Sequence, residues 1–329
     1  MVEPVERNLG LDLVRVTETA AMGAGRWLGR GDKEAADQAA VDGMRFHLAT
    51  LDIDGLVIIG EGEKDRAPML FNGEKVGTGQ GMVVDVAVDP VDGTTLTAAG
   101  IPGAIAVIAL SEGRGSMYAP GSLVYMDKIA VGPEAAGTID LEAPVEHNLK
   151  QVAKAKHKDV NDLRVVILDR PRNQRYIDDV RRAGARISLI RDGDVAGAIA
   201  TAQDETAADI LIGIGGSPEA VLTAAALLCM DGEQQCRLWP RDEEERDYAL
   251  EEGLDLEQVM TTTDLVSSDN VFFAATGVTG GDYLPAVEFR GETVVTHSVI
   301  MRSKTGSIRY MDAYHDLDRL RGISAQTLD

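Results

Sequence analysis

Two aspartates near residue 90 carry the strongest chemical signal in the sequence. Asp89 and Asp92 follow a run of valines, and the turn Gly93 to Thr95 comes directly after them. Carboxylates at the end of a strand bind hard cations through oxygen. A Gly-Thr-Thr turn presents backbone N–H and hydroxyl groups to a phosphate. The segment indicates a metal site beside a phosphate site, as phosphoryl transfer requires, although an ordinary β-turn uses the same residue types.

A second acidic segment follows another predicted strand. Residues 56–59 are apolar, and the loop Gly60 to Glu63 follows at once, so Glu61 stands at a strand end. One interpretation is a solvated acidic loop. The other is that two acidic strand ends of one sheet converge on a divalent ion, for which Mg²⁺ and Mn²⁺ prefer several carboxylates.

Lys33 and Asp37 are four residues apart on a predicted helix that Asp32 can cap. On spacing alone, a surface ion pair worth about 0.3–0.5 kcal/mol is the favoured interpretation. The functional alternative makes Asp37 a metal ligand and places the Lys33 charge near a phosphate.

A glycine-rich strand-to-helix junction lies further along the chain, at residues 213–219, and ends in Pro218 and Glu219. Glycines at such a junction let a ligand approach the N–H groups of a helix start. The spacing is not Gly-x-Gly-x-x-Gly, and no Walker Gly-Lys-Ser/Thr follows, which disfavours a nucleotide-binding oxidoreductase.

Two more strand ends carry charged residues. Arg170 and Arg172 flank Pro171 and form either an oxyanion clamp for a second phosphate or an exposed strand end. The Asp192 to Asp194 segment ends the next strand and either caps a helix or hydrogen-bonds sugar hydroxyls.

The elements that must position these residues follow an α/β pattern. Two consecutive helices are predicted within residues 13–48. Strands are predicted at residues 56–59, 82–88, 105–110 and 125–131, and we expect these strands to form one mixed sheet. After residue 158, strands alternate with helices, which predicts a largely parallel sheet with ligands at its strand C-ends. We therefore expect an N-terminal metal and phosphate half (1–157) and a C-terminal substrate-binding half (158–329) within one compact unit.

Composition narrows the class of protein. The chain has 329 residues and a formal charge of −22, which disfavours nucleic acid as a partner. Two cysteines give no disulfide framework, the five histidines show no ligand spacing, and no apolar run approaches ~20 residues. With no signal-like N-terminus, we expect a cytoplasmic protein without a membrane span.

The motifs together resemble the class II, GlpX-type fructose-1,6-bisphosphatases of the lithium-sensitive, metal-dependent sugar and inositol phosphatase superfamily. They stand in the family's order over nearly the whole chain: Gly29 to Lys33, Gly60 to Glu63 with Ala67 to Met69, Asp89 to Thr94, Asp192 to Ala196, and Gly213 to Glu219. The resemblance implies a layered α/β/α/β/α sugar-phosphatase fold. It also implies hydrolysis of fructose 1,6-bisphosphate to fructose 6-phosphate, a gluconeogenic step, by attack of a metal-bound water on the 1-phosphate.

The same resemblance implies a set of site residues. Ligands of one metal would be Asp37 and Glu61, and ligands of a second would be Asp89, Asp92 and Glu219. Substrate contacts would be Asp92, Gly93, Thr94, Tyr125, Arg170, Pro171, Arg172, Asp192, Gly193, Asp194 and Gly216. Catalytic roles would fall to Lys33, Asp65 and Thr94. Some bacterial members carry Glu in place of Asp92, so the local geometry there differs within the family.

The implied cofactor is Mn²⁺ or Mg²⁺, two or more per active site, and the implied partners are a small sugar bisphosphate and further copies in a homodimer or homotetramer. Three alternatives stay open: a sedoheptulose-1,7-bisphosphatase (alone or dual-function), an inositol-phosphate phosphatase, and a non-catalytic sugar-phosphate sensor. The strand-end arginines favour a bisphosphate, and the number of acidic residues argues against a mere sensor.

Overall fold

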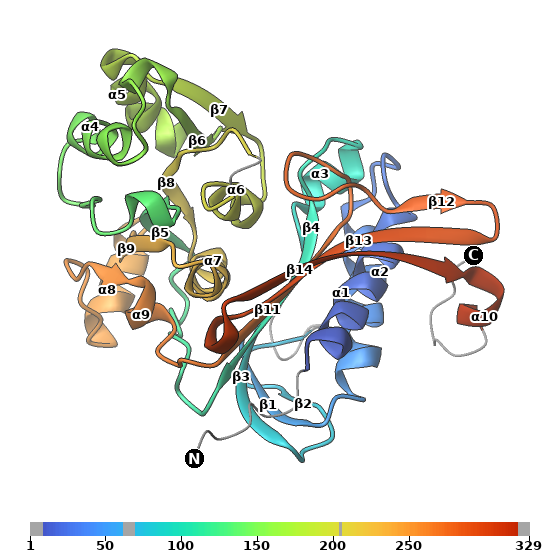
Figure 1. Ribbon diagram of the computed structural model, residues 1–329. Helices are drawn as coiled ribbons and strands as arrows, with labels where there is room; N and C mark the ends of the chain where they lie inside the picture. Colours follow the sequence, from blue (N-terminus) through green and yellow to red (C-terminus); the bar gives the residue numbers. More distant parts are fainter. Residues whose placement is uncertain (1–8, 62–69, 204–205, 322–329) are drawn as a thin grey trace, which may run out of the picture.

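The computed structural model describes residues 9–61, 70–203 and 206–321. Asp65 and the other positions from Gly62 to Met69 lie outside the described residues. Within them, two β-sheets alternate with layers of helices (Figure 1).

The first sheet takes its strands from both ends of the chain. Its order is β12-β13-β11-β4-β3-β1-β2, with β14 paired to β13. β1 and β3 are parallel and its other pairs are antiparallel. The bounds are β1 (Ile53–Ile59), β2 (Lys75–Val76), β3 (Met82–Asp92), β4 (Ile105–Glu112), β11 (Val271–Gly277), β12 (Glu288–Arg290), β13 (Thr293–Arg302) and β14 (Ser307–Asp316).

The second sheet has the order β10-β9-β5-β8-β6-β7. The bounds are β5 (Tyr125–Val131), β6 (Arg164–Leu168), β7 (Arg186–Ile190), β8 (Ile210–Gly216), β9 (Glu233–Leu238) and β10 (Met260–Thr261). As predicted, β8, β6 and β7 run parallel, but β5, β9 and β10 add antiparallel pairs. The sheet is therefore mixed, and the prediction of a largely parallel sheet was wrong for half of it.

A second correction concerns β5, which was expected to continue the first sheet and instead pairs with β8 and β9 in the second. Apolar runs specify a buried strand but not its partner or direction. Because β11 to β14 return to the first sheet, the position 157–158 does not separate the two sheets.

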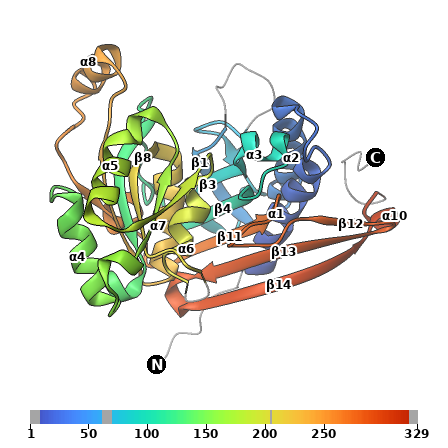
Figure 2. The same cartoon turned by 90° about the horizontal axis from the view of Figure 1, so that it is seen from above.

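Three pairs of helices form layers outside and between the sheets. α1 and α2 cover one outer side of the molecule, and α4 and α5 cover the opposite one, as Figure 2 shows from above. α6 and α7 lie between the sheets (Figures 1 and 2). The bounds are α1 (Gly10–Gly25), α2 (Lys33–Leu48), α3 (Thr94–Ala99), α4 (Val145–Ala155), α5 (Gln174–Ala183), α6 (Asp194–Ala200), α7 (Ser217–Cys229), α8 (Glu243–Glu251), α9 (Thr262–Leu265) and α10 (Leu317–Arg321), with short 3₁₀ turns at Pro133–Ala135, Val160–Asp162, Pro171–Asn173 and Ser303–Thr305.

Side-chain alternation explains the layering. On β3, Val84, Val86 and Val88 pack in one hydrophobic cluster with α1, whereas Ala87 belongs to a second cluster with α7. Two further clusters cover the faces of the second sheet, one with α4 and α5 and one with α6. The central strands of both sheets thus bury both faces, whereas no residue of β14 is buried. The α/β/α/β/α order that the resemblance implied is confirmed.

Cys229 and Cys236 are buried free thiols, and burial raises the pKa of each to about 12. Among the described residues, every helix is too short or too polar to cross a membrane.

Candidate active site

A polar cleft of about 270 Å³ lies between the C-terminal ends of β1 and β3 and the first turn of α7. β1 and β3 are parallel neighbours, so their C-terminal ends reach the same edge. The N-termini of α2, α3 and α7 reach that edge from other directions. The cleft is lined by Lys33, Glu34, Asp37, Glu61, Asp89, Val91, Asp92, Gly93, Thr94, Asp192 and Glu219.

The end of β3 directs two carboxylates into this cleft. The register with β4 shifts between Asp89 and Asp92, and the Val91 N–H donates to Asp89 Oδ1 at 3.0 Å. Gly93 then adopts φ +102°, a conformation that L side chains rarely adopt, and α3 begins at Thr94. This irregular strand end turns both carboxylates toward the same space.

Glu219 reaches the cleft from the first turn of α7. Its carboxylate folds back over Gly216, where a Cβ atom would lie 1.7 Å from Glu219 Oε2, so a side chain there would displace the carboxylate from this position. Oxygens of Asp89, Asp92 and Glu219 all lie within 4.8 Å of one another. Glu219 Oε2 is buried and has no hydrogen-bond partner among the described residues.

Mutual repulsion and burial dominate the electrostatics of the cluster. Burial, followed by the charges of Asp37 and Glu219, raises the pKa of Glu61 to about 7. Burial and then the neighbouring carboxylates raise the pKa of Asp89 and Asp92 well above the usual range. The protein alone thus disfavours full ionisation, which a cation would reverse.

The residues fit a divalent cation. Converging carboxylate oxygens are the ligand type of Mg²⁺ and Mn²⁺, and the unpartnered Glu219 Oε2 is the kind of buried acceptor that a cation satisfies. Asp37 and Glu61, whose charges act on Asp89, lie in the same cleft.

Lys33 and Asp37 both line the cleft, but Lys33 Nζ donates to Thr95 Oγ1 at 2.7 Å, which joins the start of α2 to the start of α3. Glu34 also lines the cleft and was not singled out from the sequence. The sequence feature that could have indicated Glu34 as a cleft residue is its position next to Lys33 in the first turn of α2.

The predicted basic segment lies at the C-terminal ends of β6 and β8. Arg172 Nε donates to the Ile214 carbonyl at 3.1 Å, and its guanidinium lies 4.1 Å from the ring centroid of Tyr125. Tyr125 is the register partner of Gly216, two residues beyond Ile214. Arg170, which precedes Pro171, approaches the cleft differently, with Nη2 3.4 Å from Asp192 Oδ1.

The Asp192 to Asp194 segment packs over the end of β3. Gly193 has φ +72°, and a Cβ there would lie about 3.5 Å from the Asp92 carboxylate. The Val195 N–H donates to Asp92 Oδ2 at 3.2 Å. The Asp194 side chain is buried, and its Oδ2 is 2.8 Å from Lys128 Nζ, a contact that no sequence signal indicated.

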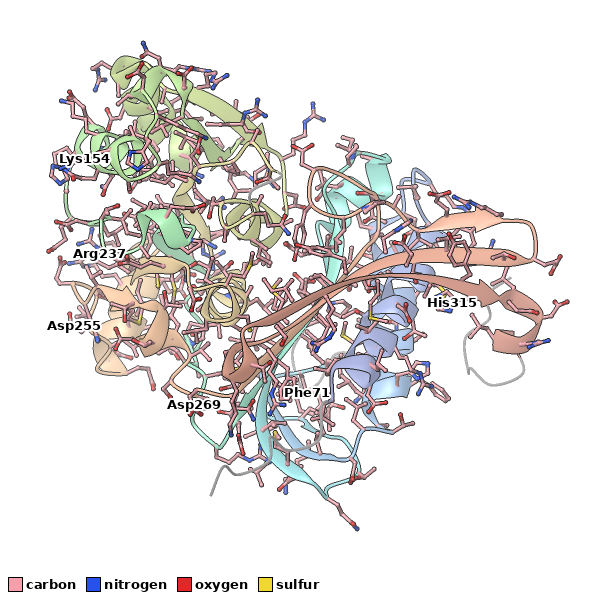
Figure 3. The ribbon with its side chains drawn as sticks, viewed as in Figure 1. Phe71, Lys154, Arg237, Asp255, Asp269 and His315 are labelled. Atoms are coloured by element: carbon pink, nitrogen blue, oxygen red, sulfur yellow. The ribbon has the colours of Figure 1, made fainter. Side chains whose placement is uncertain are left out.

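Other chemically suggestive residues have structural environments. Asp85 shares a strand with Asp89 but is fully buried and accepts the N–H groups of Ser116 and Met117 at 2.7 and 3.2 Å. His315 lies on β14, far to one side of the first sheet (Figure 3), with Nε2 2.8 Å from Thr296 Oγ1.

Comparisons with known proteins identify the family of the chain. The family described as "Bacterial fructose-1,6-bisphosphatase, glpX-encoded" matches residues 7–315. The chain is 43% identical, over a 328-residue alignment, to "Fructose-1,6-bisphosphatase 1 class 2" of Escherichia coli K12, covering 96% of this chain and 97% of the relative. It is equally similar to "Fructose-1,6-bisphosphatase class 2" of Shigella flexneri, with the same coverage.

Proposed function

Because the chain belongs to the bacterial, glpX-encoded fructose-1,6-bisphosphatase family, we propose that it hydrolyses fructose 1,6-bisphosphate to fructose 6-phosphate and phosphate. The observation that carries this proposal is the cleft. In it, carboxylates from α2, from the ends of β1 and β3 and from α7 converge beside Lys33 and Thr94. Arg170 and Arg172, which follow the C-terminal end of β6, lie beside the residues at the ends of β8 and β7. A site with an acidic, cation-binding end and a basic end suits a substrate with two phosphates.

At the acidic end, Asp37, Glu61, Asp89, Asp92 and Glu219 would hold Mn²⁺ or Mg²⁺. A bound divalent cation supplies screening of phosphate charge and acidification of water. Lys33, which Thr95 orients, adds a positive charge at the cleft wall. The Thr94 hydroxyl, at the start of α3, would orient the water or the leaving oxygen of the 1-phosphate. Asp65, outside the described residues, remains our proposed acceptor for the water proton.

At the basic end, Arg170 and Arg172 would bind the 6-phosphate, which does not react. Tyr125 supports the Arg172 guanidinium through its ring face, and the Ile214 carbonyl fixes Nε. Binding at this distal phosphate would place the 1-phosphate against the carboxylate cluster, so that binding energy is used for orientation.

The direct test is phosphate release from fructose 1,6-bisphosphate by purified protein after chelation, with Mn²⁺, Mg²⁺ or no metal added. We expect turnover with a divalent cation and none without. Sedoheptulose 1,7-bisphosphate and inositol 1-phosphate measured in parallel decide the substrate. Higher kcat/KM on either of these would replace the proposed substrate, and no release from any of them would refute phosphatase activity.

Arg172→Ala should raise KM for fructose 1,6-bisphosphate about 10–100-fold and change kcat much less. The reason is that a charged hydrogen bond to phosphate is worth about 1.5–3 kcal/mol, and the lost contact is distant from the bond that breaks. Steady-state kinetics with saturating Mn²⁺ measure both constants.

Arg175→Ala is the matched control, because Arg175 is 88% exposed and pairs only weakly with Asp179 on the surface of α5. Both constants should stay near wild type in this variant. An unchanged KM in the Arg172 variant would remove Arg172 from the substrate site.

A further inference from the structure

Lys128 is an unusual lysine for its position. It lies in the middle of β5, is only 1% exposed and is among the largest fully buried side chains described. A buried ammonium group is costly unless it is paired and hydrogen-bonded. Lys128 meets both conditions, with Nζ 2.8 Å from Asp194 Oδ2 and donating to the Gly216 carbonyl at 3.0 Å.

These two contacts join the starts of two helices. Asp194 is the first residue of α6, and Gly216 immediately precedes α7. The ion pair packs tightly against Gly215, since a Cβ there would lie 1.9 Å from Asp194 Oδ2 and 2.5 Å from Lys128 Cε. The absence of a side chain at Gly215 therefore leaves room for the Lys128–Asp194 ion pair beside the C-terminal end of β8.

Each helix start also positions one carboxylate of the cleft. On α6, the residue after Asp194 donates its N–H to Asp92 Oδ2. On α7, the Glu219 carboxylate folds over Gly216, whose carbonyl accepts from Lys128. The Lys128 ammonium group is thus linked to the Asp92 carboxylate through the start of α6, and to the Glu219 carboxylate through Gly216.

We propose that Lys128 is a positioning residue that fixes Asp92 and Glu219 in the arrangement a divalent cation needs, by joining the start of α6 to the start of α7. It touches neither the substrate nor the reacting atoms. The inference rests on the metal assignment in the proposed function, and it gives Asp194 the role of an internal partner for Lys128.

The test is calorimetric titration of Mn²⁺ into chelator-treated, dialysed protein. Lys128→Met keeps the length and apolar volume of the side chain but removes its charge and its donors. Loss of a residue that orients metal ligands typically weakens metal binding about 10–100-fold, and we expect the Kd for Mn²⁺ to rise by that factor. A folded variant with an unchanged or lower Kd would overturn the proposal.

Lys158→Met is the matched control. Lys158 Nζ lies 2.6 Å from Asp209 Oδ1, another buried carboxylate, which accepts the N–H of Arg164 at the opposite end of β6 from the cleft. This variant should lose stability yet bind Mn²⁺ with wild-type affinity. Equal weakening in both variants would show that only general stability is involved.

A second variant keeps the test decisive if Lys128→Met fails to fold. In K128M with D194N, both charges of the pair are gone, so neither member of the pair is left as an unpaired buried charge. Its Kd for Mn²⁺ should still rise at least about tenfold. If wild-type protein itself binds no Mn²⁺, the metal assignment fails instead, which separates the two possible failures.

Discussion

Asp89→Asn is expected to lower kcat for fructose 1,6-bisphosphate at least about 10³-fold at saturating Mn²⁺, a loss of about 4 kcal/mol of transition-state stabilisation. Asp89 lies at the centre of the cluster, where Glu61, Asp92, Glu219 and Asp37 all act on its charge. An amide is a weaker cation ligand than a carboxylate and removes one negative charge.

The fold should tolerate this change. In the metal-free protein, Asn relieves repulsion among buried carboxylates, so the metal-free melting temperature should stay the same or rise. The Mn²⁺-induced increase in melting temperature should shrink strongly. Phosphate release and thermal melts with and without Mn²⁺ measure the two effects separately.

Asp85→Asn is the control from the same strand. Asp85 accepts two backbone N–H groups and lies away from the cleft, so this variant should lose about 1–3 kcal/mol of stability and keep Mn²⁺-dependent turnover. Near-normal turnover of the Asp89 variant would refute the metal assignment.

The second large effect concerns pH: the stability of the metal-free protein should fall as pH rises, whereas the stabilisation by Mn²⁺ should grow. In the metal-free protein, the folded-state pKa of Glu61 is about 7, against an ordinary value of 4.5. The folded state therefore binds more protons than the unfolded state between these values, so stability falls as pH rises. This contribution is fully present below pH 4.5 and is lost as pH passes 7; the raised pKa values of Asp89, Asp92 and Glu219 act in the same direction.

A divalent cation binds the ionised carboxylates, so its stabilisation should grow over the same range. We expect the melting temperature without metal to fall by on the order of 5 °C between pH 5 and pH 8, and the Mn²⁺-induced shift to be larger at pH 8 than at pH 5. Scanning calorimetry with chelator or with Mn²⁺ at each pH measures both.

Glu61→Gln identifies the group responsible, because an amide does not titrate. The metal-free protein carrying this change should show a shallower fall. Equal Mn²⁺ shifts at pH 5 and pH 8 would contradict the assignment of the carboxylate cluster.

The parts of the site that could be predicted are those that local pattern encodes. Glu61 and Asp89 each follow a run of apolar strand residues, and neighbouring parallel strands end at one edge. For Asp37, helical spacing could not distinguish a surface pair from a cleft residue, and only the family's motif order indicated the latter.

The parts that could not be predicted depend on contacts between distant segments. Lys128 lies in a strand whose pattern gives no sign that α6 and α7 will cover it, and its partners are 66 and 88 positions away. The antiparallel pairing of β5 has the same cause, since a strand's own residues do not state which neighbour it will meet.

The cleft draws Asp37, Glu61, Asp89 and Asp92 from the first sheet and its helices, and Glu219 from the helix that follows a strand of the second. A cation held there would be a non-covalent cross-link between two bodies of the protein. The same two sheets already share one hydrophobic cluster around α7, so the cation would reinforce a contact that packing also makes. Turnover would thus require both sheets to be in place at once, and a small separation at the cleft would abolish it before either sheet unfolds.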